Sequence, residues 1–350
     1  MYFHLLGLSA LVAAVNACTG TINSLNDVSS AVKCTTVNIN GFTVPAGQAL
    51  SLSLATGATV NLNGNLVFAN KSWAGPMFVI FNGNGHTIDG RGEDYWDGQG
   101  SNGGIQKPHP MMKIKISGTF KNVKVVNSPA QTFSFGNPGA LTVSAITIDN
   151  SLGDQPNSRS GGLPAGHNTD AFDASTTDLT ISGCTVHNQD DCLAINHGSN
   201  IVFTGNSCTG GHGISVGSID SDVTVSGITI SNNKIINNDQ GLRIKTKSAA
   251  SGSTVSGITY TGNTGSGLRK FGVLIDQSYP DTLGKPGNGV KLSGVNFASG
   301  NVLSVNSGAD RVAVNCGSSS CSGTWNWSGL KVTGGKAGPV NYKGISGGSY

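Results

Sequence analysis

Charged and aromatic residues are scarce in this 350-residue chain, at 11% and 6% of the sequence. No run of like charges and no proline-rich linker divides the chain, so nothing indicates a second domain. No nucleic-acid-binding motif accompanies the net charge of +3, so nucleic acid is not an expected partner. The chain is instead rich in glycine, with 52 residues, and in short Val, Ile and Thr runs between Gly, Asn and Ser. This composition favours strands over helices and predicts a single all-β domain.

Long hydrophobic runs are absent after the N-terminus, where no segment approaches the ~20 apolar residues of a membrane span. Residues 1–17, MYFHLLGLSALVAAVNA, are apolar and end in small residues, with Val15 and Ala17 where a signal peptidase reads. They predict a secretory signal cleaved before Cys18, although the run lacks an initial Lys or Arg. We therefore expect a secreted, extracellular mature chain, residues 18–350, without membrane association. NKS at Asn70 and NWS at Asn326 are candidate N-glycosylation sites.

The seven cysteines are spaced in no zinc-binding pattern, so we expect no metal site. In a secreted chain they favour disulfides. Three local pairings are 18–34, 192–208 and 316–321, formed by Cys18, Cys34, Cys192, Cys208, Cys316 and Cys321. They would leave Cys184 as a buried thiol, but spacing alone does not determine the connectivity.

An internal repeat runs through the middle of the chain. LTISGCTV, IVFTGNSC, VTVSGITI, STVSGITY and VKLSGVNF each place a small-residue corner between two β-runs. The corners at positions 182, 204, 226, 256 and 293 are 22, 22, 30 and 37 residues apart. A period in the twenties with short strands is typical of a solenoid whose coils stack over a continuous core. Because the Leu/Asn frame of leucine-rich repeats is missing, the pattern predicts a right-handed parallel β-helix.

Acidic residues and a histidine recur at the same place in successive coils. Asp170 lies in HNTDAFD, Asp190 and Asp191 in NQDDC, and His212 in GGHGISV. Adjacent strands lie roughly 4.8 Å apart. We therefore expect the carboxylates of neighbouring coils about one strand apart, with the imidazole one step further on.

Two cations follow in the next coil. In GLRIK, Leu242 and Ile244 fall on one face of a strand and Arg243 and Lys245 on the other, so both cations are expected to project outward together.

Turn formation is the alternative interpretation for single aspartates in so Asn- and Gly-rich a chain. It is the expected role of Asp173, Asp178, Asp220 and Asp222. For Asp190 and Asp191 a structural role is unfavourable, because adjacent carboxylates repel each other. On a regular strand they would also face opposite sides, unless a turn or bulge redirects one of them.

Four ordered motifs resemble the signature of the polygalacturonases, family 28 of the glycoside hydrolases. They are NTD at 168–170, DD at 190–191, GHG at 211–213 and RIK at 243–245. The resemblance extends to WAGP at 73–76, VHNQDDCLA at 186–194 and the tyrosine of DQSYPD at 276–281. It is strongest to secreted fungal endopolygalacturonases. It implies inverting hydrolysis of α-1,4-linked polygalacturonate on a parallel β-helix, by a monomer without a cofactor.

The resemblance also implies residue roles. The position of Asp190 is that of the general acid, and those of Asp170 and Asp191 hold and deprotonate the attacking water. His212 supports the protonation of the acid, and Asn168 contributes to the cleft near the water. This division agrees with inverting glycosidases, which need an acid and a base on opposite sides of the bond with room for water. A disulfide from Cys192 to Cys208 would fix the backbone that aims both carboxylates.

Substrate binding is the role implied for the cations. Each galacturonate unit carries a carboxylate, and Arg243 and Lys245 supply a forked donor and a point charge for it. By resemblance, Tyr279 lines the same region. The RIK motif favours homogalacturonan over rhamnogalacturonan.

Three features depart from the family pattern. His197 places an imidazole near the cleft where a hydroxyl is common, and Asp220 stands where glycine is commoner. Residues 151–166 form a longer segment than usual, which is expected to overhang the cleft. A cleft closed at one end would favour an exopolygalacturonase, which is the nearest alternative function.

Two other functions fit a pectin-binding β-helix. A calcium-dependent pectate lyase would draw calcium ligands from the aspartates and cut by β-elimination, but an acid pair beside a histidine fits hydrolysis better. A noncatalytic pectin-binding protein would tolerate the loss of either paired aspartate, whereas a hydrolase would not.

Overall fold

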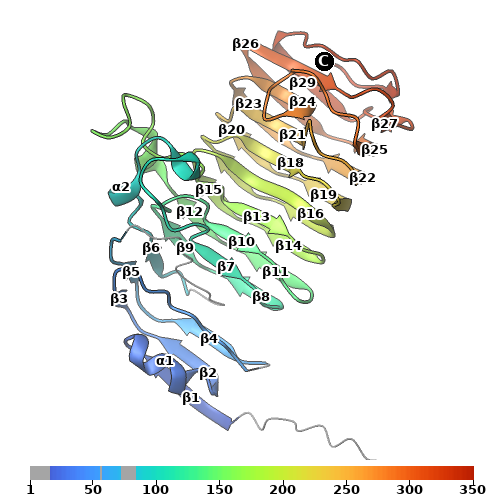
Figure 1. Ribbon diagram of the computed structural model, residues 1–350. Helices are drawn as coiled ribbons and strands as arrows, with labels where there is room; N and C mark the ends of the chain where they lie inside the picture. Colours follow the sequence, from blue (N-terminus) through green and yellow to red (C-terminus); the bar gives the residue numbers. More distant parts are fainter. Residues whose placement is uncertain (1–15, 56, 72–83) are drawn as a thin grey trace, which may run out of the picture.

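The computed structural model describes residues 16–55, 57–71 and 84–350. The described chain winds into coils stacked along one axis, from the N-terminal coils in blue to the C-terminal coils in red (Figure 1). Strands of neighbouring coils pair in parallel throughout. The predicted all-β class and parallel β-helix are confirmed, and parallel crossovers in proteins are right-handed almost without exception.

Each coil contributes a strand to up to three stacks. The stack that carries the site runs through β7 (Met112–Ile114), β10 (Phe133–Phe135), β13 (Phe172–Ser175), the first part of β16 (Asp191–Thr204), β18 (Gly213–Ile219), β21 (Gln240–Lys247), β24 (Phe271–Tyr279) and the last part of β26 (Asn301–Asn315). A second stack contains β8 (Gly118–Lys121), β11 (Leu141–Ser144), β14 (Leu179–Ser182), the end of β16, β19 (Thr224–Ser231), β22 (Ser253–Thr261), β25 (Val290–Phe297) and β27 (Cys321–Ser322).

The third stack contains β3 (Phe42–Val44), β5 (Leu66–Phe68), β6 (Thr87–Asp89), β9 (Lys124–Val126), β12 (Thr147–Asp149), β15 (Thr185–His187), β17 (Ser207–Thr209), β20 (Lys234–Ile236), β23 (Thr264–Leu268), the start of β26 and β29 (Leu330–Lys336). Strands β1 (Asn16–Ile22), β2 (Cys34–Ile39) and β4 (Thr59–Leu62) form the N-terminal sheet, and β28 (Trp325–Asn326) pairs with β30 (Ile345–Ser346) near the C-terminus.

Helices are few and short in the described chain. They are α1 (Val28–Ala31) and α2 (Gly92–Tyr95), with three 3₁₀ turns at Leu25–Asp27, Gly100–Asn102 and Ser151–Asp154. None of these described helices is long or apolar enough to cross a membrane.

Alternating residues of each strand point into a continuous core. In β14 and β11, for example, Leu179, Ile181, Leu141 and Val143 are buried while their neighbours face outward. Like residues then stack on like from coil to coil, and the rings of Phe133 and Phe172 lie 5.9 Å apart. Burial of this alternating set fixes the register, because a one-residue slip would turn it outward.

The repeat alignment was right at three of its four steps. Position 182 pairs with 204, 226 with 256, and 256 with 293. The step from 204 to 226 was wrong, because Thr204 pairs with Ser231 and Ser226 pairs with Ser199. The similar TG and SG dipeptides misled the alignment, since Gly205 follows the end of β16 whereas Gly227 lies inside β19.

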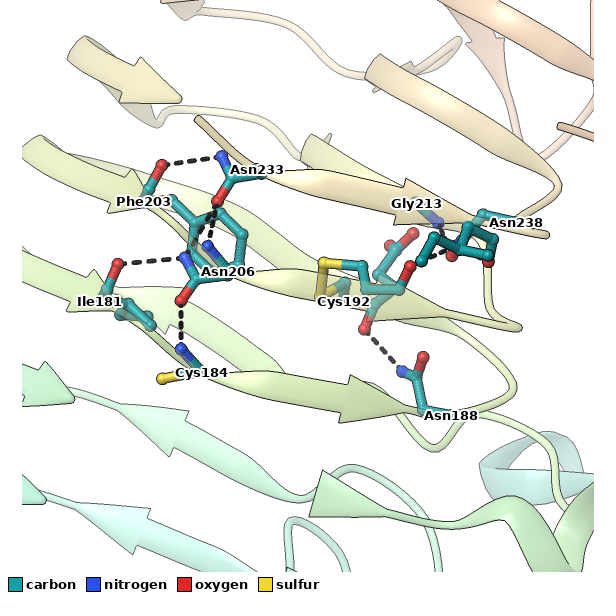
Figure 2. The surroundings of a disulfide bond; sticks show 12 residues. Ile181, Cys184, Asn188, Cys192, Phe203, Asn206, Gly213, Asn233 and Asn238 are labelled. Atoms are coloured by element: carbon teal, nitrogen blue, oxygen red, sulfur yellow. Dashed lines mark hydrogen bonds between the residues drawn. A yellow bond between two sulfur atoms is a disulfide. The ribbon is translucent and has the colours of Figure 1, made fainter. Parts of the chain in front are cut away.

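A ladder of buried asparagines marks the true coil equivalence. The side-chain oxygen of Asn233 accepts hydrogen bonds from the backbone and side chain of Asn206, and Asn263 and Asn301 continue the pattern. Cys184 stands at the next ladder position, where its N–H donates to Asn206 Oδ1 at 2.8 Å (Figure 2). The predicted buried thiol is confirmed, and burial raises its pKa to about 12.

The three predicted disulfides are present. Cys18 bonds to Cys34, Cys192 to Cys208 and Cys316 to Cys321. Both sequon asparagines, Asn70 and Asn326, are exposed. The WAGP motif and nearly all of the predicted signal segment 1–17 lie outside the described residues.

Candidate active site

The predicted site residues line one cleft of ≈ 420 Å³ on the outer face of β13, β16, β18 and β21. The lining includes Asn168, Asp170, Asp190, Asp191, His212, Arg243, Lys245 and Tyr279. Register explains why they meet. The N–H of Ala171 donates to Asp191 O, the N–H of His212 donates to Asp190 O, and Asp191 pairs with Gly213. Residues about one coil apart in the sequence therefore stand side by side.

A β-bulge lets both members of the aspartate pair face the cleft. The register shifts between Asp191 and Leu193, where the two residues pair with consecutive residues of β18. Next to the bulge, Cys192 is bonded to Cys208, and the side-chain amide of Asn188 donates to Asp191 O at 3.0 Å (Figure 2). These two links hold the backbone that aims the two carboxylates.

Asp190 accepts three hydrogen bonds. Its Oδ1 lies 2.9 Å from His212 Nδ1 and accepts from the N–H of Asp191 at 2.8 Å. Its Oδ2 accepts from the side-chain amide of Asn168 at 3.0 Å. Burial raises the pKa of Asp190, but the positive charge and hydrogen bond of His212 outweigh burial, so the net direction is downward. In return, Asp190 raises the pKa of His212 against the opposing effect of burial.

Asp191 is fully buried between the two cations. Arg243 Nη2 donates to Asp191 Oδ1 at 2.5 Å, and Lys245 Nζ donates to Oδ2 at 2.7 Å. The hydroxyl of Ser215 donates to Oδ1 as well. Burial raises the pKa of Asp191, and Arg243 and Lys245 lower it further than burial raises it. Asp191 is therefore held ionised.

The two cations lie on the predicted outer face but are less free than expected. Arg243 and Lys245 are only 9% and 8% exposed, and each holds Asp191. Arg243 has five N–H donors and Lys245 has three, so the ion pairs leave donors for an incoming carboxylate. Tyr279 lies beside them, with its ring centroid 5.1 Å from Lys245 Nζ.

Asp173 is not the turn residue that the sequence was expected to place there. It occupies an outward position of β13 and lines the cleft with Asp170. Burial, followed by the charges of Asp191 and Asp190, raises the pKa of Asp173 to about 8. Burial and the neighbouring aspartates also raise the pKa of Asp170 well above its ordinary value. Asp170 Oδ1 is buried and accepts no hydrogen bond from the described residues.

The other three aspartates lie in loops between strands, with Asp222 in a turn, Asp178 in a bend and Asp220 just before the turn that contains Asp222. Asp178 and Asp222 adopt left-handed backbone conformations, with φ of 58° and 59°. Asp220 is exposed and pairs with Lys247.

His212 is held on both sides of its ring. Nδ1 faces Asp190, and Nε2 lies 3.8 Å from Oδ2 of Asp239. Glycine is required at positions 211 and 213, on either side of His212, because backbone carbonyl groups of neighbouring coils lie very close to them. An added Cβ would lie 2.0 Å from Asp190 O at Gly211 and 2.1 Å from Gln240 O at Gly213.

Asp239, Arg269 and Lys270 were missed from the sequence. Arg269 Nε donates to Asp239 Oδ1 at 2.8 Å, and Lys270 Nζ lies 2.6 Å from Oδ2. Arg269 also donates to the carbonyl oxygen of Gly210 at 2.7 Å, which fastens the turn before His212. The only available signal was that Asp239 lies about one coil after His212, and Arg269 one coil after that.

The departures from the family pattern have different outcomes. His197 is exposed and does not itself line the cleft, whereas its neighbour Asn196 does. Segment 151–166 borders a second hollow of ≈ 570 Å³ that shares His167 and His212 with the cleft. Its residues Leu163 and Pro164 form a wall there, and Asp154 binds His187 at 2.7 Å.

A shared cation site is disfavoured by the charges already present. Ligand atoms of Asp190, Asp191 and His212 lie within 4.8 Å of one another, close enough to hold a metal ion. Both oxygens of Asp191 are engaged by cationic side chains, however, and Asp190 faces His212. A divalent cation would be repelled by three positive groups, so the arrangement is better suited to acid–base chemistry.

A parallel β-helix with an aspartate-lined cleft, an imidazole and paired cations defines a carbohydrate-processing enzyme of the glycoside hydrolase class. Residues 34–343 match glycosyl hydrolases family 28, and the chain belongs to this family. It is 43% identical over 358 residues to a polygalacturonase of Cochliobolus carbonum, covering 95% of this chain and 94% of that protein. It is also 42% identical to endopolygalacturonase I of Aspergillus aculeatus, covering 92% and 87%.

Solved structures agree in fold. Endopolygalacturonase I of Stereum purpureum, complexed with two galacturonates, superimposes with a TM-score of 0.90 at 47% identity, covering 94% of this chain and 99% of that one. An endo-xylogalacturonan hydrolase from Aspergillus tubingensis shares the fold at 22% identity, with a TM-score of 0.63 and coverage of 91% and 100%.

Proposed function

We propose that the protein is an endopolygalacturonase that hydrolyses internal α-1,4 bonds of polygalacturonate with inversion. The observation that carries this proposal is the contrast between two adjacent carboxylates in one cleft. Asp190 is coupled to an imidazole that can supply a proton, whereas Asp191 is held ionised by Arg243 and Lys245. The similarity to named endopolygalacturonases supports the substrate and the endo mode of attack.

Asp190 acts as the general acid in this mechanism, with His212 as its proton donor. The hydrogen bond between Asp190 Oδ1 and His212 Nδ1 holds one proton that either group can carry. In the resting cleft the proton is on His212, because the pKa of His212 is raised and that of Asp190 is lowered. As the glycosidic bond breaks, this proton moves from His212 to Asp190 and on to the leaving oxygen, so His212 becomes neutral and Asp190 is again ionised.

Asp191 and Asp170 act on the water. Asp191 is ionised and orients it, while Asp170 is the stronger base because burial and like charges raise its pKa. Asp170 lines the cleft in which that water would bind. For the base to work, Asp170 must be ionised while the His212–Asp190 pair keeps its proton.

Arg243 and Lys245 bind the carboxylate of the sugar beside the scissile bond, and Tyr279 lies alongside. Their remaining N–H donors bind the substrate carboxylate while the same two cations hold Asp191. Asn168 fixes the other oxygen of Asp190.

The physiological setting of the enzyme is also inferred. We expect residues 1–17 to be removed on secretion and residues 18–350 to act outside the cell as a monomer. The three disulfides support the extracellular location, because disulfides form and persist in oxidising compartments. Asn70 and Asn326 remain candidate glycosylation sites. The N-terminal sequence of the secreted protein tests the removal of residues 1–17. Its mass tests glycosylation, and its mass in native solution tests the monomer.

The test of function is incubation with polygalacturonate in the presence of a chelator. We expect reducing ends to rise without ultraviolet absorbance from unsaturated products, while viscosity falls early and mixed oligomers appear. Absorbance that a chelator abolishes would mean a lyase. Release of monomer or dimer at nearly constant viscosity would mean an exo-enzyme, with segment 151–166 as the wall that closes the cleft. The Asp190→Asn variant is the inactive control.

A further inference from the structure

Residues 97–107, called here the 97–107 loop, reach the catalytic cleft from the end of the segment that contains α2. The tip of the loop, Ser101 and Asn102, lines the cleft together with Asn168 and Asp190. Both tip residues are exposed, so the position of the tip depends on the contacts that hold the loop.

A buried ion pair closes the base of the 97–107 loop. Lys107 Nζ lies 2.7 Å from Asp97 Oδ1, and the two side chains are only 0% and 6% exposed. Asp97 also accepts hydrogen bonds from the N–H of Gln99 at 3.0 Å and from the N–H of Ile105 at 2.8 Å. Lys107 Nζ donates to Ile105 O at 2.9 Å. The two ends of the loop are therefore held together.

Two further hydrogen bonds join the loop to its surroundings. The N–H of Gly98 donates to Ala165 O at 2.9 Å, in the segment that borders the second hollow. Nearer the tip, Gln131 Nε2 donates to Ser101 Oγ at 3.2 Å. The base and the tip of the loop are thus each bound to a different neighbour.

The tip packs directly against residues 167 and 168. A Cβ added at Gly100 would lie 2.5 Å from Asn168 Oδ1 and 2.6 Å from His167 O. Any side chain at position 100 would therefore force the loop and Asn168 apart.

Asn168 joins the loop to the general acid. Its Oδ1 accepts from the N–H of Ser101 at 3.2 Å, and its Nδ2 donates to Asp190 Oδ2 at 3.0 Å. The amide oxygen and nitrogen are similar in size, but a backbone N–H can only donate. Ser101 therefore requires the oxygen on its own side, which places the nitrogen toward Asp190. His167 Nδ1 lies 2.9 Å from the same oxygen and is a second donor in the tautomer that carries its proton there.

We propose that the 97–107 loop is a positioning element for the general acid, in which Ser101 orients the Asn168 amide and that amide fixes the carboxylate of Asp190. The inference rests on the proposed function for the role of Asp190. His212 holds Oδ1 and Asn168 holds Oδ2, so the carboxylate is prevented from rotating. Ser101 acts through Asn168 and not on the reacting atoms.

The experiment begins with Gly100→Ala, which pushes the tip of the loop away from Asn168. The matched control is Gly161→Ala. Both glycines have a left-handed backbone, with φ of 57° and 59°, so alanine costs about the same strain at each. A Cβ at position 161 would have nothing within 4 Å, so only the first variant disturbs Asn168.

We expect kcat of Gly100→Ala on polygalacturonate to fall about ten- to a hundredfold with KM within about twofold of the parent, because a misplaced acid impairs the chemical step and not binding. Gly161→Ala should keep both constants. Circular dichroism and Tm verify that both variants are folded. A higher KM at unchanged kcat would overturn the proposal, because the loop would then be only a wall that contacts the substrate.

A double-mutant cycle separates action through Asn168 from a general disturbance of the cleft. Asn168→Ala alone should lower kcat, and Gly100→Ala should lower it no further in that background, because the amide is no longer there to displace. If the two losses multiply, the loop acts independently of Asn168 and the proposal is wrong. Full kcat in Asn168→Ala would overturn it as well.

A second variant serves if Gly100→Ala does not fold. Asp97→Asn/Lys107→Met removes the ion pair as a unit, so that no buried charge is left without its partner. It loosens the base of the loop without touching Asn168. We expect it to lower kcat in the parent background and to leave kcat unchanged in the Asn168→Ala background. An equal loss in both backgrounds would contradict the proposal.

This inference and the proposed function fail in different ways. If the parent hydrolyses no polygalacturonate, the proposed function is wrong whatever the variants do. If the parent hydrolyses it and the folded Gly100→Ala variant keeps its kcat, only the positioning role of the 97–107 loop is wrong.

Discussion

Nε2 of His212 lies 3.8 Å from Oδ2 of Asp239, on the opposite side of the imidazole from Asp190. The ring therefore stands between two carboxylates, both of which favour its protonated form. Asp239 is 8% exposed and is itself held by Arg269 and Lys270. It is positioned to act on the proton donor without touching the substrate.

Replacing Asp239 with Asn should lower the pKa of His212. The imidazolium then loses one neighbouring anion, while Arg269 and Lys270 lose their partner and repel it. Because hydrolysis needs the proton of the His212–Asp190 pair, activity should be lost at lower pH, by roughly half a pH unit. The profile of kcat/KM against pH measures this shift, and an NMR titration of His212 locates it.

The matched control is Asp220→Asn, which removes an exposed carboxylate that pairs with Lys247. An alkaline limb that stays in place for Asp239→Asn, with the His212 titration unmoved, would show that Asp239 serves structure alone.

Arg243→Ala should change more than substrate binding. Loss of the guanidinium removes one partner of the substrate carboxylate, so KM for polygalacturonate should rise. It also removes the 2.5 Å ion pair that lowers the pKa of Asp191. The acidic limb of the kcat profile should therefore move to higher pH, because Asp191 becomes protonated sooner. A rise in KM with an unchanged acidic limb would mean that Lys245 alone keeps Asp191 ionised.

Asp173 should make the folded protein less stable as pH rises. Its pKa is raised to about 8 in the fold, whereas an unfolded aspartate titrates near 3.9. Above pH ~4 the unfolded chain releases this proton and the folded chain keeps it, so the contribution of Asp173 to stability falls between pH ~4 and about 8. Asp173→Asn removes this penalty.

The free energy of unfolding of the variant minus that of the parent should be roughly 1–2 kcal/mol larger at pH 8 than at pH 4. This corresponds to a difference of a few degrees in Tm. Thermal unfolding at both values tests this, with the turn variant Asp178→Asn as the control. A difference in Tm between variant and parent that is the same at pH 4 and pH 8 would contradict the interpretation.

Much of the site was predictable because residues about one coil apart in the sequence lie side by side on neighbouring strands. Asp170, Asp190 and His212 are about 20 residues apart, and each one-coil step brings the next beside the last. Where coil length changed, the same reasoning failed. Position 204 was matched with 226 on a similar dipeptide, whereas the buried Asn206 and Asn233 define the true 27-residue step.

Other features depend on contacts that a pattern does not contain. Asp173 resembled a turn residue because a single outward aspartate in a three- or four-residue strand looks the same as one in a loop. Arg269 reaches the turn before His212 from two coils away, through a side chain whose direction no spacing reveals. The ion pairs of Arg243 and Lys245 with Asp191 were hidden for the same reason, since alternation gives the face of a side chain but not its partner.

The Cys192–Cys208 disulfide should matter for catalysis as well as for stability. Its 16-residue separation corresponds to about 3 kcal/mol of stabilisation on the loop-entropy model. It also follows Asp191 directly, at the β-bulge that turns both carboxylates into the cleft. We therefore expect Cys192→Ser/Cys208→Ser to lower Tm and also to lower kcat, because Asp191 would lose its fixed direction relative to Arg243 and Lys245.

The comparison is Cys316→Ser/Cys321→Ser, which opens a disulfide of five-residue separation that lines no part of the cleft. That variant should lose less stability and keep its kcat at temperatures well below its Tm. If both double variants kept full kcat, the backbone at Asp191 would be held by hydrogen bonds such as that of Asn188 and by packing, and the disulfide would contribute to stability alone.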